Sequence, residues 1–318
     1  MSTTARTRRS RRRLFLYALL ALAGLVVVLN WTVGRLPTTP RPTGSFMTLA
    51  KGVRLRYLER PGAEPAVLLI HGLPGTAEDF EYVTPLIQGH RTIAIDRPGF
   101  GFSTGGYFPF NRQLQAVHEV IERLRLARPV LVGHSYGGTI SLGYAERYPG
   151  AVRGLVLVDA AAGQCSRHDG FLVRSQAHLI KVLEAPVIAQ IADVTFSQLL
   201  RTASSAPQED EAFSPAPVNP RHRQRVLAIS LKHGNLEAYS GEMLAADREI
   251  EAVNRGLTAV HVPTIVIQGE QDKLVLPKCG RSIAASLSGA HLQMLPGGHM
   301  APYTHPAAVA TAALSLAR

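Results

Sequence analysis

Short apolar runs recur along most of the chain and alternate with segments of helical periodicity. Residues 66–70, 91–96 and 154–159 are largely apolar runs rich in β-branched residues, as is typical of buried parallel strands. Between them, apolar positions repeat every three or four residues near 77–87 and over 111–126, which predicts helices. Strands and helices that alternate in this way indicate a mostly parallel sheet with helices on both faces.

Both ends of this region add strands. At its start, residues 46–50 and 53–58 alternate between apolar and polar positions around a bend, which predicts an antiparallel hairpin. At its end, residues 262–269 and 291–295 are two further strands. The helices that follow them are expected at 277–287 and from Pro306. With a strand at 129–133, these segments predict an eight-stranded sheet.

The alternation stops between residues 163 and 253. Helical patterns such as 171–183 and 187–200 follow one another there with no buried strand between them. We therefore expect one α/β domain in two parts, residues 46–162 and 254–318, interrupted by a helical insertion.

A second kind of apolar segment precedes this domain. Residues 14–34 would span about 30 Å as a helix, which is the thickness of the hydrocarbon core of a bilayer. Residues 1–13 hold six arginines, which retain that end in the cytoplasm, and Trp31 is placed to anchor the far end. We expect a basic cytoplasmic tail, a transmembrane signal anchor, a linker at 35–45 and the α/β domain outside the cytoplasm. A cleaved export signal or an organellar targeting peptide is the alternative.

The formal charge of +11 comes mainly from the N-terminal region. Residues 1–45 contain eight arginines and no acidic residue, so the remaining 26 basic and 23 acidic residues carry only +3. No folded face is expected to be strongly basic, and a nucleic-acid partner is not expected. The chain of 318 residues, 46% of them hydrophobic, is long enough for one large domain with an insertion. Its two cysteines, Cys165 and Cys279, are interpreted as separate buried thiols, with a single bridge as the alternative.

The candidate chemistry begins where the strand at 129–133 turns directly into a helix. The turn consists of Gly133, His134, Ser135, Tyr136 and Gly137. A turn this sharp strains the serine backbone, and glycines on both sides let the strand and the helix approach each other. It also raises the hydroxyl of Ser135 above the sheet and places the amide of Tyr136 at a helix N-terminus. Ser135 is therefore the candidate nucleophile.

A serine hydroxyl needs an imidazole to accept its proton and a carboxylate to orient that imidazole. His299 follows the last strand after a glycine-containing turn, and Asp272 follows the strand before it. Both positions lie just after the carboxyl end of a strand, where an open α/β sheet has its crevice. Asp159, at the end of the strand at 154–159, is the alternative acid.

These segments resemble the α/β-hydrolase fold from about Phe46 onward. The turn at Ser135 matches the nucleophile elbow G-x-S-x-G, residues 269–272 resemble the acid loop G-x-x-D, and residues 71–75 resemble the loop H-G-x-P-G. The resemblance implies a triad of Ser135, Asp272 and His299, with the insertion as a helical cap that roofs the site.

The resemblance also implies an oxyanion hole formed by the backbone amides of Leu73 and Tyr136. His71 is interpreted as a residue that braces its loop. The candidate substrate-site residues are His71, Gly72, His134 and, in the cap, Phe171 and Phe196.

The function expected is a membrane-anchored serine hydrolase that cleaves carboxylic esters of small or medium-sized apolar molecules through an acyl-enzyme. The alternative reactions are hydrolysis of a carbon–carbon bond in a diketone, amide or peptide cleavage, and perhydrolysis. The non-enzymatic alternative is a noncatalytic ligand-binding protein of the same fold. The glycine motifs lack the residues of a phosphate or dinucleotide site, so no cofactor is expected. The sequence shows no metal-ligand spacing, so no metal is expected.

Overall fold

The computed structural model describes residues 14–22, 24–25, 28, 40–164, 209–230 and 233–318. These residues contain one eight-stranded sheet in the order β1-β2-β4-β3-β5-β6-β7-β8. The strands are β1 (Ser45–Thr48), β2 (Arg54–Arg60), β3 (Ala63–Ile70), β4 (His90–Ile95), β5 (Val130–His134), β6 (Gly154–Val158), β7 (Thr264–Gly269) and β8 (His291–Leu295). The pairs β1–β2 and β2–β4 are antiparallel and the other five pairs are parallel. The predicted mostly parallel sheet of eight strands is confirmed.

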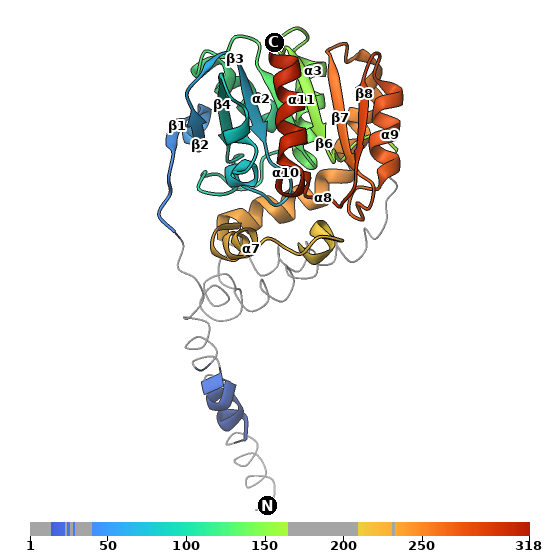
Figure 1. The fold of residues 1–318 in the computed structure, drawn as a ribbon. Coiled ribbons are helices and arrows are strands. Elements are labelled where there is room, and N and C mark those ends of the chain that lie inside the picture. Colours follow the sequence, from blue (N-terminus) through green and yellow to red (C-terminus); the bar gives the residue numbers. More distant parts are fainter. Residues whose placement is uncertain (1–13, 23, 26–27, 29–39, 165–208, 231–232) are drawn as a thin grey trace, which may run out of the picture.

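Helices cover both faces of the sheet (Figure 1). The helices are α2 (Phe110–Arg123), α3 (Tyr136–Arg147), α7 (Pro220–Arg225), α8 (His233–Gly256), α9 (Pro277–Ser286), α10 (Ala301–Thr304) and α11 (Pro306–Ala317). Successive side chains of β3 point to opposite faces, so Leu68 and Ile70 join the core beneath α2, α3 and α9, whereas Val67 and Leu69 join the core beneath α11. The continuous apolar runs in the sequence reflect strands that are buried on both faces.

The segment at 77–87, predicted to be a helix, is instead two short 3₁₀ turns, η2 (Ala77–Phe80) and η3 (Thr84–Leu86). Its backbone bonds connect residues three apart, as in the bond from the amide of Val83 to the carbonyl of Phe80. Pro85 stands at the start of η3 and has no amide for an α-helical bond. The remaining short elements are η1 (Ala50–Gly52), the π-helical η4 (Val226–Ser230) and η5 (Leu257–Ala259).

The described part of the insertion is helical. In Figure 1, α7 and α8 lie below the sheet, at the same end as α10. Helix α8 continues to Gly256, past residue 253 where the insertion was expected to end. The predicted helices at 171–183 and 187–200 lie outside the described residues.

Cys279 is disulfide-bonded, so the interpretation of the two cysteines as separate buried thiols is wrong. The other cysteine of the chain, Cys165, lies outside the described residues.

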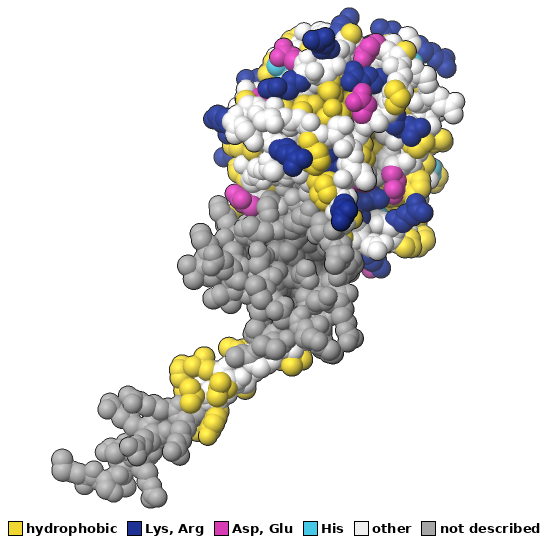
Figure 2. All heavy atoms as spheres, turned by 90° about the vertical axis from the view of Figure 1, so that its left-hand side faces the viewer, with side chains coloured by type: hydrophobic (Ala, Val, Ile, Leu, Met, Phe, Trp, Pro, Cys, Tyr) yellow, Lys and Arg dark blue, Asp and Glu magenta, His cyan; other side chains and the backbone are white. Residues whose placement is uncertain are grey.

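At the N-terminus, residues 14–22 are helical, and the large apolar side chains among them are between 48% and 69% exposed (Figure 2). Among the residues that the structure describes, no helix has both the length and the apolarity to cross a membrane. The transmembrane helix predicted over 14–34 is therefore not confirmed, and part of that range lies outside the described residues.

Glycines allow three backbone segments to meet at the end of β5. A Cβ on Gly137 would lie 2.1 Å from the carbonyl oxygen of Ile70, and one on Gly133 would lie 2.5 Å from the carbonyl oxygen of Gly137. Ser135, between β5 and α3, has φ 53° and ψ −121°. This is the strained strand-to-helix turn that the sequence predicts.

We expect Gly137→Ala to destabilise the protein by about 3 kcal/mol, because the new methyl group would meet backbone that cannot rotate away. The steric cost must therefore also exceed the gain of about 1 kcal/mol in helix propensity that alanine brings over glycine. Gly150→Ala is the matched control, since Gly150 has φ 78° but nothing within 4 Å of its added Cβ, so it should cost only about 1 kcal/mol. Urea unfolding of the full chain measures both values. Equal losses in the two variants would contradict the close approach at Gly137.

Candidate active site

Ser135 is held in place by backbone bonds to three segments. Its amide donates to the carbonyl of Val158 at 2.9 Å, and its carbonyl accepts from the amides of Gly138 at 2.9 Å and Ala161 at 3.0 Å. The residue is 9% exposed. The nucleophile candidate thus lies at the carboxyl edge of the sheet, between the ends of β5 and β6.

The predicted base and acid are in direct contact. Nδ1 of His299 lies 2.8 Å from Oδ2 of Asp272, and both side chains are buried. The other carboxylate oxygen of Asp272 accepts from the amides of Leu274 and Val275, each at 2.9 Å. A proton on Nδ1 that is shared with the carboxylate leaves Nε2 as the acceptor of the imidazole.

The electrostatics of this pair suit a general base. Burial is the largest single influence and acts to lower the pKa of His299. The charge of Asp272, its hydrogen bond to the imidazole and the nearby Asp159 together outweigh burial, so the pKa is raised above its ordinary value. The pair would therefore stabilise an imidazolium formed when a hydroxyl gives up its proton.

The loop of His299 is bound to the nucleophile elbow and to the described part of the insertion. Nε2 of His134 lies 2.9 Å from the carbonyl oxygen of His299, and the two imidazole rings are 4.9 Å apart at their centroids. The amide of His299 donates to the carbonyl of Ala212 at 2.9 Å. His134, predicted to contact substrate, therefore connects the elbow to the loop of the base.

Asp159, the alternative acid, is a buried neighbour of the pair. It accepts from the amide of Gly269 at 2.7 Å and from the side-chain amide of Gln268 at 3.3 Å. The same Gln268 nitrogen lies 3.2 Å from Oδ2 of Asp272. Burial, together with the negative charge of Asp272, raises the pKa of Asp159 to about 8. Because Asp272 is bonded to the imidazole and Asp159 is mostly neutral at pH 7, the geometry favours Asp272 as the orienting acid.

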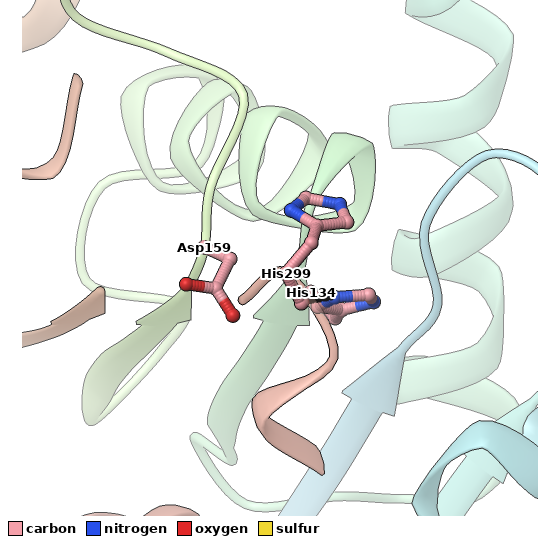
Figure 3. A group of neighbouring side chains, drawn as sticks. All are labelled: His134, Asp159 and His299. Atoms are coloured by element: carbon pink, nitrogen blue, oxygen red, sulfur yellow. Dashed lines mark hydrogen bonds between the residues drawn. The ribbon is translucent and has the colours of Figure 1, made fainter. Parts of the chain in front are cut away.

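Figure 3 shows a cluster that sequence spacing did not reveal, because its members come from three separate strand ends. Potential ligand atoms of His134, Asp159 and His299 lie within 4.8 Å of one another. Nδ1 of His299 already contacts Asp272, and Nε2 of His134 contacts the carbonyl oxygen of His299. Two nitrogens of the cluster are therefore engaged, so we assign it no metal.

The loop predicted to carry one oxyanion donor runs beside the serine. A Cβ on Gly72 would lie 2.8 Å from Cβ of Ser135. Nε2 of His71 accepts from the amide of Arg97 at 3.0 Å, so Nδ1 carries the proton and donates to the carbonyl of Gly72 at 2.9 Å. Burial lowers the pKa of His71 well below its ordinary value and keeps the ring neutral. This geometry supports the interpretation of His71 as a bracing residue.

The oxyanion donors, the amides of Leu73 and Tyr136, stay a prediction. Leu73 is half-buried and Tyr136 is buried at the N-terminus of α3. Of the predicted substrate residues, Phe171 and Phe196 lie outside the described residues.

The sequence did not indicate Arg97 as a residue of the site. Its side chain is buried, and it binds Glu242 of α8, 145 residues away, at 2.7 Å. The available signal was weak, because Arg97 is one charged residue in the loop after β4, two residues past the strand's last residue, Ile95.

Comparison with known proteins bears on the fold and the family. A family model described as alpha/beta hydrolase fold matches residues 65–306. Lipase 1 of Psychrobacter immobilis is 28% identical over 265 residues, which cover 80% of this chain and 77% of the lipase. The 2-hydroxy-6-oxononadienedioate/2-hydroxy-6-oxononatrienedioate hydrolase of Escherichia coli is 23% identical and covers 85% of this chain and 93% of its own. A crystal structure of an alpha/beta hydrolase fold protein from Burkholderia ambifaria superposes with a TM-score of 0.70 at 21% identity, over 86% of this chain and all of that one.

We expect Asp272→Asn to lower kcat for a p-nitrophenyl ester by about 10³–10⁴-fold, because the neutral amide cannot hold the imidazole in the required tautomer. The same change removes the charge that raises the pKa of His299, so the loss of activity on acidification should move to lower pH.

Asp159→Asn is the matched control for this substitution. It should change kcat by less than about 5-fold at pH 7, because the carboxyl that it replaces is mostly protonated there. If Asp159→Asn abolished turnover and Asp272→Asn did not, the acid would be Asp159.

Proposed function

The chain belongs to the alpha/beta hydrolase fold family, and from this premise we propose that it is a serine hydrolase of carboxylic esters with small or medium-sized apolar groups. The observation that carries the proposal is the buried pair of His299 and Asp272, which lies against the elbow of Ser135. An isolated buried imidazole would lose affinity for its proton, whereas this one gains it.

In the proposed reaction, Ser135 attacks the ester carbonyl while Nε2 of His299 accepts the hydroxyl proton. Asp272 holds the imidazole and stabilises the imidazolium. The amides of Leu73 and Tyr136 donate to the oxygen of the tetrahedral intermediate, where each donor contributes about 2.7–4 kcal/mol. The imidazolium then protonates the departing alcohol, and a water molecule activated by His299 releases the acid from Ser135.

Esters are the preferred substrate class for two reasons. Their alcohols need less protonation to depart than amines do, so an ester makes the smaller demand on the proton that the imidazolium supplies. In addition, two of the relatives are named as lipases, from Psychrobacter immobilis and a Moraxella species. Among the alternatives, amide cleavage and perhydrolysis have no comparable support.

Hydrolysis of a carbon–carbon bond is the second candidate. It is favoured by the match to the 2-hydroxy-6-oxononadienedioate/2-hydroxy-6-oxononatrienedioate hydrolase of Escherichia coli, which this chain matches over 93% of that protein's length. The same triad residues would serve, so the substrate alone distinguishes the two reactions. A noncatalytic binding protein is the third candidate, and the aligned acid and base disfavour it.

We expect a fluorophosphonate probe to label the wild-type protein and not Ser135→Ala, because the probe reacts only with an activated serine. Ser141→Ala is the matched control, since that hydroxyl is buried and donates within α3 to the carbonyl of Gly137, and it should label normally. A parallel panel of acyl esters of graded length, one vinylogous diketone and one amide would identify the bond that is cleaved. Folded wild-type protein that failed to label would favour the binding-protein alternative.

We also propose that the N-terminal segment anchors the protein in a membrane, with the catalytic domain outside the cytoplasm. Most of the large apolar side chains that are exposed in the described residues belong to this segment. The other two are Leu86 and Leu274. Such a concentration of apolar surface marks a site of contact with lipid or protein, and the arginines before it suit the cytoplasmic side.

We expect the full chain to stay with the membrane fraction after an alkaline carbonate wash, and a variant that lacks residues 1–39 to be recovered in the soluble fraction. The N-terminal mass of the membrane-bound form separates an intact anchor from a cleaved export signal. Release of the intact full chain by carbonate would contradict the anchor.

A further inference from the structure

Arg97 binds the loop that carries a predicted oxyanion donor. Its Nη2 donates to the carbonyl of Gly72 at 2.7 Å, and its Nε donates to the carbonyl of His71 at 3.1 Å. Its backbone amide donates to Nε2 of the His71 ring at 3.0 Å. One residue thus fixes two consecutive carbonyls and the ring beside them.

The carbonyl of Gly72 belongs to the same peptide unit as the amide of Leu73. A peptide unit is planar and trans, so its C=O and N–H bonds point in opposite directions. Because Arg97 and the Nδ1–H of His71 both hold the carbonyl, they determine where the amide of Leu73 points. A charged donor on the carbonyl also polarises the peptide and strengthens its N–H as a hydrogen-bond donor.

Arg97 is itself held by α8. Its guanidinium forms a two-point contact with Glu242, with Nη1 at 2.7 Å from Oε1 and Nη2 at 3.0 Å from Oε2. Gln113 of α2 also donates to Oε1 of Glu242, at 2.5 Å. The side chains of Arg97 and Glu242 are 1% and 0% exposed, so the guanidinium must compensate for the hydration that the carboxylate loses. Burial raises the pKa of Glu242 to about 7, and the charge of Arg97 opposes that rise.

The same helix reaches the second predicted donor. The hydroxyl of Tyr136 donates to Glu249, seven residues after Glu242 in α8. The guanidinium carbon of Arg97 also lies 5.4 Å from the centroid of the Tyr136 ring. Helix α8, which lies below the sheet in Figure 1, therefore contacts the residues that set both donors.

We propose that Arg97 and Glu242 are positioning residues that orient the amide of Leu73 toward the oxyanion, and that α8 of the insertion thereby controls the rate of the chemical step. The proposal rests on the proposed function, since an oxyanion forms only if Ser135 attacks a carbonyl. Arg97 and Glu242 themselves need not touch the substrate.

The test compares Glu242→Gln and Arg97→Lys with the wild-type full chain. Glutamine removes the charge that holds Arg97, and lysine offers a single donor centre that cannot bind the carbonyl of Gly72 and the carboxylate together. Because loss of a whole oxyanion donor costs about 10²–10³-fold in kcat, a misdirected donor should cost about 10–100-fold. KM for the ester should change by less than about 3-fold. The inhibition constant of a trifluoromethyl ketone, whose hemiketal oxygen would occupy the hole, should rise in parallel with the loss in kcat.

Glu78→Gln is the control for a general loss of stability. Glu78 pairs with the buried Arg56 at 2.5 Å, and its hydrogen bonds within the described residues do not reach residues 71–73. All three variants should melt at a lower temperature, but Glu78→Gln should keep its kcat. If Glu242→Gln and Arg97→Lys fold and retain kcat within 2-fold, or lose it only in proportion to Glu78→Gln, the proposal is overturned.

Labelling of Ser135 distinguishes failure of the positioning role from failure of the proposed hydrolase function. Wild-type labelling and turnover with unchanged kcat in the variants would overturn the positioning role and leave the hydrolase standing. Absence of both labelling and turnover in the folded wild-type protein would overturn both.

Discussion

The close approach of three backbone segments at Ser135 underlies everything else at this site. Gly137 allows the first turn of α3 to lie against the carbonyl of Ile70, and Gly133 allows the same turn to lie against the end of β5. The resulting strain at Ser135 is maintained because bonds to Val158, Gly138 and Ala161 fix its backbone. Residues 71–73 can then pass beside the serine, and the loop of His299, whose imidazole contacts Asp272, is bonded to His134 of the elbow.

Much of this arrangement could be predicted from the sequence because its signals are local. Apolar runs predicted six of the eight strands, since strands buried on both faces lack polar positions, and alternation of apolar and polar residues predicted the two strands of the N-terminal hairpin. The elbow was predictable because a strained serine needs glycines at fixed offsets, as Gly133 and Gly137 are. The acid and the base were predictable because each follows a strand end, and the structure places His299 against Asp272.

Other features depend on contacts that sequence does not encode locally. Periodicity alone could not separate an α-helix from the two 3₁₀ turns at 77–87, where Pro85 removes an amide. The contact between Arg97 and Glu242 joins residues 145 positions apart, and each is an ordinary charged residue in its own segment. The disulfide bond of Cys279 likewise could not be predicted from the cysteine count.

Gln268 imposes a limit on how many charges this interior can hold. Its side-chain nitrogen has two hydrogens, yet it lies within 3.3 Å of three acceptors, on Asp159, Asp272 and the carbonyl of Val275. Two anionic carboxylates would compete for the hydrogens of this one amide, whereas a protonated Asp159 needs its hydrogen bond less. With Asp159 protonated, as it mostly is at pH 7, the two carboxyl groups that Gln268 binds carry one negative charge between them. When the imidazole of His299 becomes cationic, this buried group of side chains is electrically neutral overall. Burial lowers the affinity of the imidazole for that proton and so partly offsets the attraction of Asp272.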